Sequence, residues 1–143
     1  MTERARRRRA LSDEKGRTVA VDPSEAEIAR LVAEGPDGPV VMLNLLRFRP
    51  DGRASYEEYS RQAGRFLKKY GGEVLHAGDG GTPLVAETGQ SWDAVLVVRY
   101  PSRAAFGAMV ADPEYRAITH LRTRALSEAV LQPTTPWGTR SRG

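Results

Sequence analysis

The segment Val40–Phe48 constrains the fold more than any other part of the sequence. It reads VVMLNLLRF, so its side chains are apolar at both odd and even positions, with Asn44 and Arg47 as the polar exceptions. Successive side chains of a strand point to opposite faces of a sheet, and a strand apolar on both faces needs cover on both. Residues 92–100 have the same character. The chain is therefore predicted to build a sheet that is covered on both sides.

Three helical regions are predicted from apolar residues at helical spacing and from the capping residues that bracket them. They cover about residues 22–35, 55–70 and 102–126, the last with a break at Asp112-Pro113. Asp22 is the expected N-cap of the first helix, with Pro23 at its first position. The second region opens with the capping-box pattern Ser55-Tyr56-Glu57-Glu58.

Shorter apolar runs predict the remaining strands at residues 73–77, 84–88 and 129–132, with a hairpin across 78–83. The resulting order is an α+β, ferredoxin-like β-α-β-β-α-β arrangement with an antiparallel sheet and an extra N-terminal helix. Its helices would cover one face of the sheet and leave the other face apolar and open. Such a patch usually marks an association surface. We therefore expect a homodimer in which two sheets face each other as a dimeric α+β barrel.

The positive charge of the chain belongs to its N-terminal end. Seven of the 22 Lys and Arg residues and three of the 18 acids fall within residues 1–17, so the rest carries 15 of each sign. The run Arg6–Arg9 could contact nucleic acid or a membrane surface, but a basic terminus is typical of a solvated leader. We interpret residues 1–21 as a disordered basic leader, 22–135 as the folded domain and 136–143 as a flexible tail.

Composition narrows the partners and the compartment. No apolar stretch approaches the ~20 residues that a membrane span needs, and no apolar segment of a signal peptide follows the arginines. The sequence has no cysteine, so disulfides, thiolate nucleophiles and cysteine metal sites are excluded. We expect a cytoplasmic protein that binds neither nucleic acid nor a membrane.

Several sequence stretches, in the same order and at plausible spacing, resemble domain-of-unknown-function family 1330. They are Pro39–Phe48, Trp92-Asp93, Tyr100–Arg103, Asp112–Tyr115 and His120–Arg122. The similarity extends over about residues 22–135. It implies the dimeric α+β barrel superfamily, which includes cofactor-free monooxygenases, lactone isomerases, polyketide cyclases and heme proteins. The resemblance therefore implies a scaffold and leaves the reaction open.

Motifs that hold common cofactors are absent from the sequence. No phosphate-binding Gly-x-x-x-x-Gly-Lys-Ser/Thr occurs, and Gly78-Asp79-Gly80-Gly81 is better interpreted as a hairpin loop than as a dinucleotide fingerprint. His76 and His120 are the two histidines, and they fall on different predicted elements. A protein metal site would need carboxylates to complete it. We expect neither a metal nor an organic cofactor.

The candidate catalytic residues are His76, His120 and Arg122. Histidine moves protons near neutral pH, and an arginine can stabilise an enolate or a carboxylate. Residues two apart on a helix diverge by about 200°, so at most one of His120 and Arg122 is expected to reach a cavity. The apolar stripe of that helix favours His120. The alternative interpretation is an exposed edge-strand histidine and a solvated basic stripe.

The candidate substrate-binding residues are polar or aromatic side chains within apolar elements: Asn44, Tyr56, Tyr59, Trp92 and Tyr100. A buried Asn44 amide needs a hydrogen-bond partner, either the backbone or a ligand. The aromatic residues either line a pocket or belong to the plain core. Arg47 has the opposite strand parity from Asn44, so the two are not expected to share a cavity.

These features favour a small cofactor-independent enzyme. It would bind an apolar oxygenated molecule, polyketide-like or aromatic, and catalyse a proton transfer such as cyclisation or isomerisation. A histidine would abstract the proton, and an arginine or Asn44 would stabilise the enolate. The alternatives are a cofactor-free monooxygenase of a phenolic substrate and a non-catalytic small-molecule-binding protein.

Overall fold

The computed structural model describes residues 10–12 and 18–138. In chain order its elements are β1 (Ala10–Ser12), β2 (Thr18–Ala20), α2 (Glu25–Glu34), β3 (Val40–Phe48), α3 (Gly52–Lys69), β4 (Glu73–Asp79), β5 (Ala94–Tyr100), α4 (Arg103–Ala111), α5 (Pro113–Arg116), α6 (Thr119–Thr123) and β6 (Leu126–Thr134).

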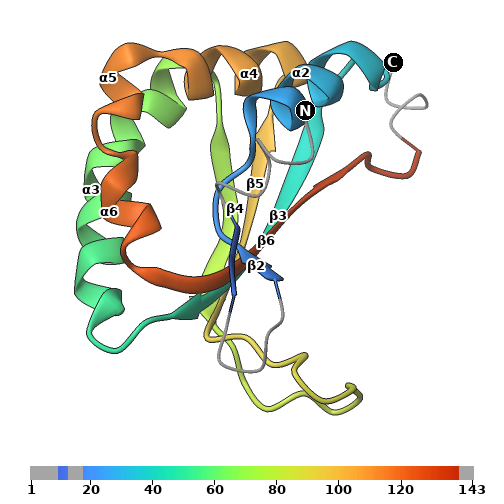
Figure 1. The fold of residues 1–143 in the computed structure, drawn as a ribbon. Coiled ribbons are helices and arrows are strands. Elements are labelled where there is room, and N and C mark those ends of the chain that lie inside the picture. Colours follow the sequence, from blue (N-terminus) through green and yellow to red (C-terminus); the bar gives the residue numbers. More distant parts are fainter. Residues whose placement is uncertain (1–9, 13–17, 139–143) are drawn as a thin grey trace.

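The main sheet has four antiparallel strands in the order β4-β5-β3-β6, and α3 to α6 lie on one side of it (Figure 1). This is the predicted ferredoxin-like arrangement, with α2 as the extra N-terminal helix. The doubly apolar strand β3 lies in the interior of the sheet, between β5 and β6. Asn44 is level with Leu96 on one neighbour and with Leu131 on the other.

The two faces of β3 have different surroundings. Val40, Met42 and Leu46 are buried beneath the helices. Val40 and Met42 belong to a core cluster with Phe66 of α3, and Leu46 to a second cluster with Tyr56. The opposite face is open, and its aliphatic side chains are partly exposed. They are Val41, Leu43 and Leu45 of β3, Val95 and Val97 of β5, and Val130 of β6.

The predicted starts of the first two helical regions are shifted in the structure. Ser24, not Asp22, caps α2, because its side chain accepts a hydrogen bond from Glu27 N at 3.1 Å. The helix α3 begins at Gly52, three residues before the predicted capping box. Ser55 consequently lies inside the helix, where its hydroxyl donates to Leu121 O at 2.8 Å. Asp22 and Ser55, which the local pattern assigned to helix capping, instead form hydrogen bonds to residues distant in sequence.

The strand predicted at residues 84–88 is wrong. This segment is irregular and exposed, with Leu84 and Val85 almost fully solvent-accessible, and β4 pairs directly with β5. The third helical region is divided into α4, α5 and α6. It ends at Thr123 because β6 already begins at Leu126, earlier than the predicted strand at 129–132.

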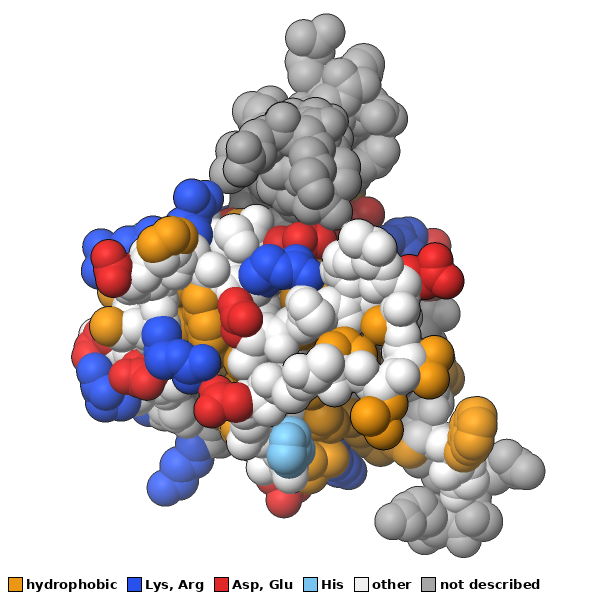
Figure 2. Space-filling view, turned by 90° about the horizontal axis from the view of Figure 1, so that it is seen from below, with side chains coloured by type: hydrophobic (Ala, Val, Ile, Leu, Met, Phe, Trp, Pro, Cys, Tyr) orange, Lys and Arg blue, Asp and Glu red, His pale blue; other side chains and the backbone are white. Residues whose placement is uncertain are grey.

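The N-terminal segment contains structure that the sequence did not predict. Strands β1 and β2 form an antiparallel pair, β2 lies beside β6, and Val21 is buried. The run Arg6–Arg9 lies outside the described residues. On the face seen in Figure 2, Lys and Arg side chains alternate with Asp and Glu side chains, as expected for a nearly neutral domain. None of the described helices is long and apolar enough to cross a membrane.

Candidate ligand cavity

A cavity of about 520 Å³ lies between the sheet and the helices α2, α4, α5 and α6. Its wall is largely apolar, with Ile28 of α2, Phe106 and Met109 of α4 and Leu131 of β6. A second hollow of about 410 Å³ adjoins it between α2 and β6. We refer to the first as the ligand cavity, because the polar groups described next belong to it.

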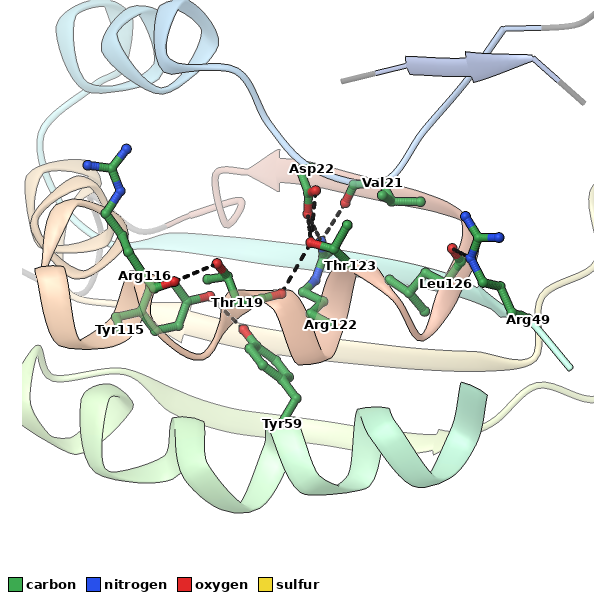
Figure 3. A network of polar contacts seen from close by, with 10 residues as sticks. All are labelled: Val21, Asp22, Arg49, Tyr59, Tyr115, Arg116, Thr119, Arg122, Thr123 and Leu126. Atoms are coloured by element: carbon green, nitrogen blue, oxygen red, sulfur yellow. Dashed lines mark hydrogen bonds and ion pairs between the residues drawn. The ribbon is translucent and has the colours of Figure 1, made fainter. Parts of the chain in front are cut away.

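Arg122 is the charged residue that lies deepest in the wall of the ligand cavity. It is 7% exposed and extends from α6 toward the segment that precedes α2 (Figure 3). Its Nη1 donates to Val21 O and to Asp22 Oδ1, the latter at 3.2 Å. Its Nη2 is buried and has no hydrogen-bond partner in the part of the chain that the structure describes. A buried donor without an acceptor costs about 1–3 kcal/mol, so this nitrogen needs an acceptor from elsewhere.

Asp22 holds the arginine in place. Its carboxylate accepts hydrogen bonds from Thr123 Oγ1, at 3.0 Å on Oδ2, as well as from Arg122. The contact joins α6 to the N-terminal entry of α2 across 100 residues of sequence. Asp22 therefore lines the cavity and does not cap α2.

Three tyrosines add hydroxyl groups to the wall. Tyr59 of α3 and Tyr115 of α5 form an O–H···O hydrogen bond of 2.6 Å, and Tyr100 lies at the end of β5. Burial raises the pKa of all three phenols, so they remain protonated donors near neutral pH. In the Tyr59–Tyr115 pair one hydroxyl donates to the other, which leaves the accepting hydroxyl with its own hydrogen free for a ligand.

Asn44 also lines the cavity, on the helix-covered face of β3. Its Nδ2 contacts Met42 O at 3.4 Å, a long hydrogen bond within its own strand. Good N–H···O bonds are about 2.7–3.2 Å long, so the amide is weakly satisfied. Arg47 lies on the opposite face, as strand parity requires, and forms an ion pair with Glu128 at 2.5 Å.

The two histidines lie outside this cavity. His76 is opposite Val97 in the sheet, on the open face, and is exposed. His120 is exposed on α6, where its Nδ1 lies 3.1 Å from Ala117 O. The preference for His120 over Arg122 is therefore wrong. Arg122 and Leu121 are the buried residues of α6, whereas His120 is on its exposed side.

Two of the predicted aromatic residues do not line the cavity either. Trp92 lies under the guanidinium of Arg47, whose Cζ is 4.3 Å from the ring centroid. Tyr56 is buried in the core against Phe48 and Tyr59, and burial raises its pKa to about 12. The structure therefore brings Asn44, Tyr59, Tyr100 and Arg122 to one cavity.

Sequence reasoning missed Asp22 and Tyr115 as members of the cavity wall. Asp22 was assigned to helix capping, and Tyr115 stands in the Asp112–Tyr115 stretch without a role of its own. For the inward direction of Arg122 a signal was available. Arg122 lies four residues after Ile118 and three before Ala125, and residues three and four apart lie on one face of a helix. Among the described residues, no group of three His, Asp or Glu side chains is placed to hold a metal ion.

Comparison with known proteins identifies the family. The model of the family described as Domain of unknown function (DUF1330) matches residues 45–132. The chain belongs to this family. A crystal structure of a protein of unknown function from Rhodopseudomonas palustris is 33% identical, with a TM-score of 0.74, over 81% of this chain and 95% of that one. Its methylated form gives 32% identity and a TM-score of 0.77, over 85% and 97%.

A more distant structure shares the fold of this DUF1330 member. SnoaB, a cofactor-independent oxygenase from Streptomyces nogalater, is 15% identical with a TM-score of 0.51, over 71% of this chain and 96% of its own. At this identity the likeness concerns the fold alone. A search of curated proteins found no significant match.

Proposed function

We propose that this protein binds a small, mostly apolar, oxygen-bearing molecule in the ligand cavity, with Arg122 as its polar anchor. The observation that carries the proposal is Arg122, which lines a cavity of about 520 Å³ and whose buried Nη2 has no acceptor among the described residues. That volume is typical of small-molecule sites, which combine an apolar wall with a few placed polar groups. A ligand oxygen would satisfy the donor, and the tyrosine hydroxyls would hold the same end of the ligand.

Ligand binding is proposed rather than histidine catalysis, because both histidines are exposed and lie outside the cavity. A general base must come within hydrogen-bond reach of the proton that it removes. Neither histidine meets this condition in the chain.

The test compares the wild type with Arg122→Lys and Arg124→Lys in a melting-temperature screen of small aromatic ketones, quinones and acids. Lysine keeps the positive charge beside Asp22 but lacks the second nitrogen. Arg124 directly follows α6, is exposed and donates to Ser55 Oγ, so Arg124→Lys is the matched control.

We expect at least one compound to raise the melting temperature of the wild type and of Arg124→Lys, with the shift lost in Arg122→Lys. Each tenfold loss of affinity corresponds to about 1.4 kcal/mol of binding free energy. Equal shifts in all three proteins, or no shift with any compound, would contradict the proposal.

A second candidate function, proton transfer on the bound molecule, rests on the carboxylate of Asp22 in the same wall as the donors. Asp22 would take a proton from the carbon next to a ligand carbonyl, and the electron pair would pass to the oxygen as an enolate. Arg122 and the tyrosine hydroxyl would stabilise that oxyanion.

The test follows exchange of the acetyl hydrogens of 2-acetylnaphthalene in D₂O by NMR. Catalysed exchange that is lost in Asp22→Asn supports an enolising enzyme, and exchange at the uncatalysed rate rejects it. Oxygen uptake with a phenolic substrate would instead indicate the cofactor-free oxygenase.

A further inference from the structure

The charged residues that line the ligand cavity pair with one another. They are Asp22, Glu25, Arg116 and Arg122. Arg122 is paired with Asp22 at 3.2 Å, and Arg116 with Glu25 at 3.1 Å. The second pair is exposed, whereas Arg122 is almost buried. The wall therefore has no net formal charge, and the deep guanidinium already has a carboxylate as its counter-ion.

The polar groups of the wall that lack a partner are mainly donors. Among the described residues, Nη2 of Arg122 has no acceptor and the hydroxyl of Tyr100 forms no hydrogen bond. The Tyr59–Tyr115 pair leaves one further O–H hydrogen available. Such a wall selects a ligand for its acceptor oxygens.

From this arrangement we infer that the ligand is an uncharged carbonyl compound, such as a ketone, quinone or lactone, and not a carboxylate. The inference rests on the proposed function and specifies its ligand class. A neutral carbonyl oxygen satisfies Nη2 and adds no charge to a balanced wall. A carboxylate on Nη2 would place a second anion on a guanidinium that Asp22 already neutralises. Two carboxylates that share one site repel each other, and burying a charge without its own partner is costly.

Three probes with one ring system separate the possibilities: 2-acetylnaphthalene, 2-naphthoate and 2-ethylnaphthalene. They present a neutral carbonyl, a carboxylate and no oxygen, respectively, on the same apolar body. Affinities are measured near neutral pH by protein-observed NMR titration with the wild type, Arg122→Lys and the control Arg124→Lys. We expect the wild type to bind the ketone at least about tenfold more tightly than either other probe.

Asp22→Asn supplies the sharper test, because it removes the counter-ion and leaves Arg122 as an unbalanced cation. The affinity ratio of 2-naphthoate to 2-acetylnaphthalene should rise at least about tenfold in this variant. Circular dichroism and the melting temperature establish that it is folded. If Asp22→Asn is not folded, the inference is tested by the wild type alone, through its affinities for 2-acetylnaphthalene and 2-naphthoate.

The outcomes distinguish this inference from the proposed function. Naphthoate binding that equals or exceeds ketone binding and is lost in Arg122→Lys overturns the inference and leaves the proposed function standing. An unchanged affinity ratio in folded Asp22→Asn also overturns the inference. Binding that Arg122→Lys leaves unaltered, or no binding of any probe, overturns the proposed function itself.

Discussion

A guanidinium that is almost buried needs acceptors for its N–H groups. Within the described part of the chain, Nη1 of Arg122 has acceptors and the buried Nη2 has none. The residue was recognisable from sequence as a candidate, together with Asn44, Tyr59 and Tyr100. Its inward direction was not recognised, although the spacing of Ile118, Leu121 and Ala125 carried a signal for it. The contact with Asp22 spans 100 residues. No local pattern predicts such a contact.

Asp112 shows a different use of a buried carboxylate, at a junction of elements. It caps α5 through Glu114 N at 2.9 Å and accepts hydrogen bonds from Tyr70 Oη at 2.7 Å and Lys69 Nζ at 3.0 Å. The Tyr70 hydrogen bond, followed by that of Lys69, holds the pKa of Asp112 well below its usual range. The carboxylate therefore joins the end of α3 to the break between α4 and α5.

The pH dependence of stability tests this role of Asp112. A folded-state pKa below the unfolded value of ~3.9 stabilises the fold above that pH, and the stabilisation is lost as the pH falls toward the folded pKa. Asp112→Asn keeps a capping side chain but removes the charge, so it should lower the melting temperature near neutral pH. The difference from wild type should shrink below about pH 4. A difference that stays constant down to acidic pH would contradict the role.

At the scale of elements, apolar patterns were more informative than capping motifs. The strands β3 and β5 were predicted close to their observed bounds, because a doubly apolar run suits a covered strand. The start of α3 was missed because it depends on Asp51, a residue with φ of 64° that precedes a buried glycine. The exposed segment 84–88 has strand-like composition, but it pairs with none of the described strands.

Two glycines of α3 provide a matched test of how this helix is held. A Cβ on Gly52 would lie 2.1 Å from Ala125 O, which is itself fixed as the acceptor of Arg49 N at 2.9 Å. Gly52→Ala should therefore destabilise the protein by more than ~2 kcal/mol in denaturant unfolding. Gly64 has open space around its Cβ position, so Gly64→Ala should stabilise by about 0.5–1 kcal/mol. Equal effects of the two changes would refute this packing at Gly52.

At the scale of the whole molecule, the open face of the sheet remains to be covered. Six aliphatic side chains of β3, β5 and β6 are partly exposed there, and His76 lies on the same face. The sequence predicted this face from the parity of β3. A cavity between the sheet and the helices was also expected, but not the composition of its wall, which depends on the contact of Asp22, before α2, with Arg122 and Thr123 of α6.

We predict that a second copy of the chain covers the open face. Leu43→Lys, at the centre of β3 between Val97 and Gln132, should yield a folded monomer where the wild type is a dimer. Val32→Lys changes an exposed aliphatic residue of α2 and is the control that should remain dimeric. Light scattering coupled to size-exclusion chromatography measures both. A folded wild-type monomer at micromolar concentration would exclude this assembly.

The central claim is that Arg122 Nη2 anchors a ligand in the cavity between the sheet and α2, α4, α5 and α6. A crystal structure of the protein soaked with 2-acetylnaphthalene tests it most directly. We predict electron density for the ring among Ile28, Phe106 and Met109, with the carbonyl oxygen about 2.7–3.2 Å from Nη2. Density for the probe only in the hollow between α2 and β6 or on the open sheet face, with Nη2 still without an acceptor, would contradict it.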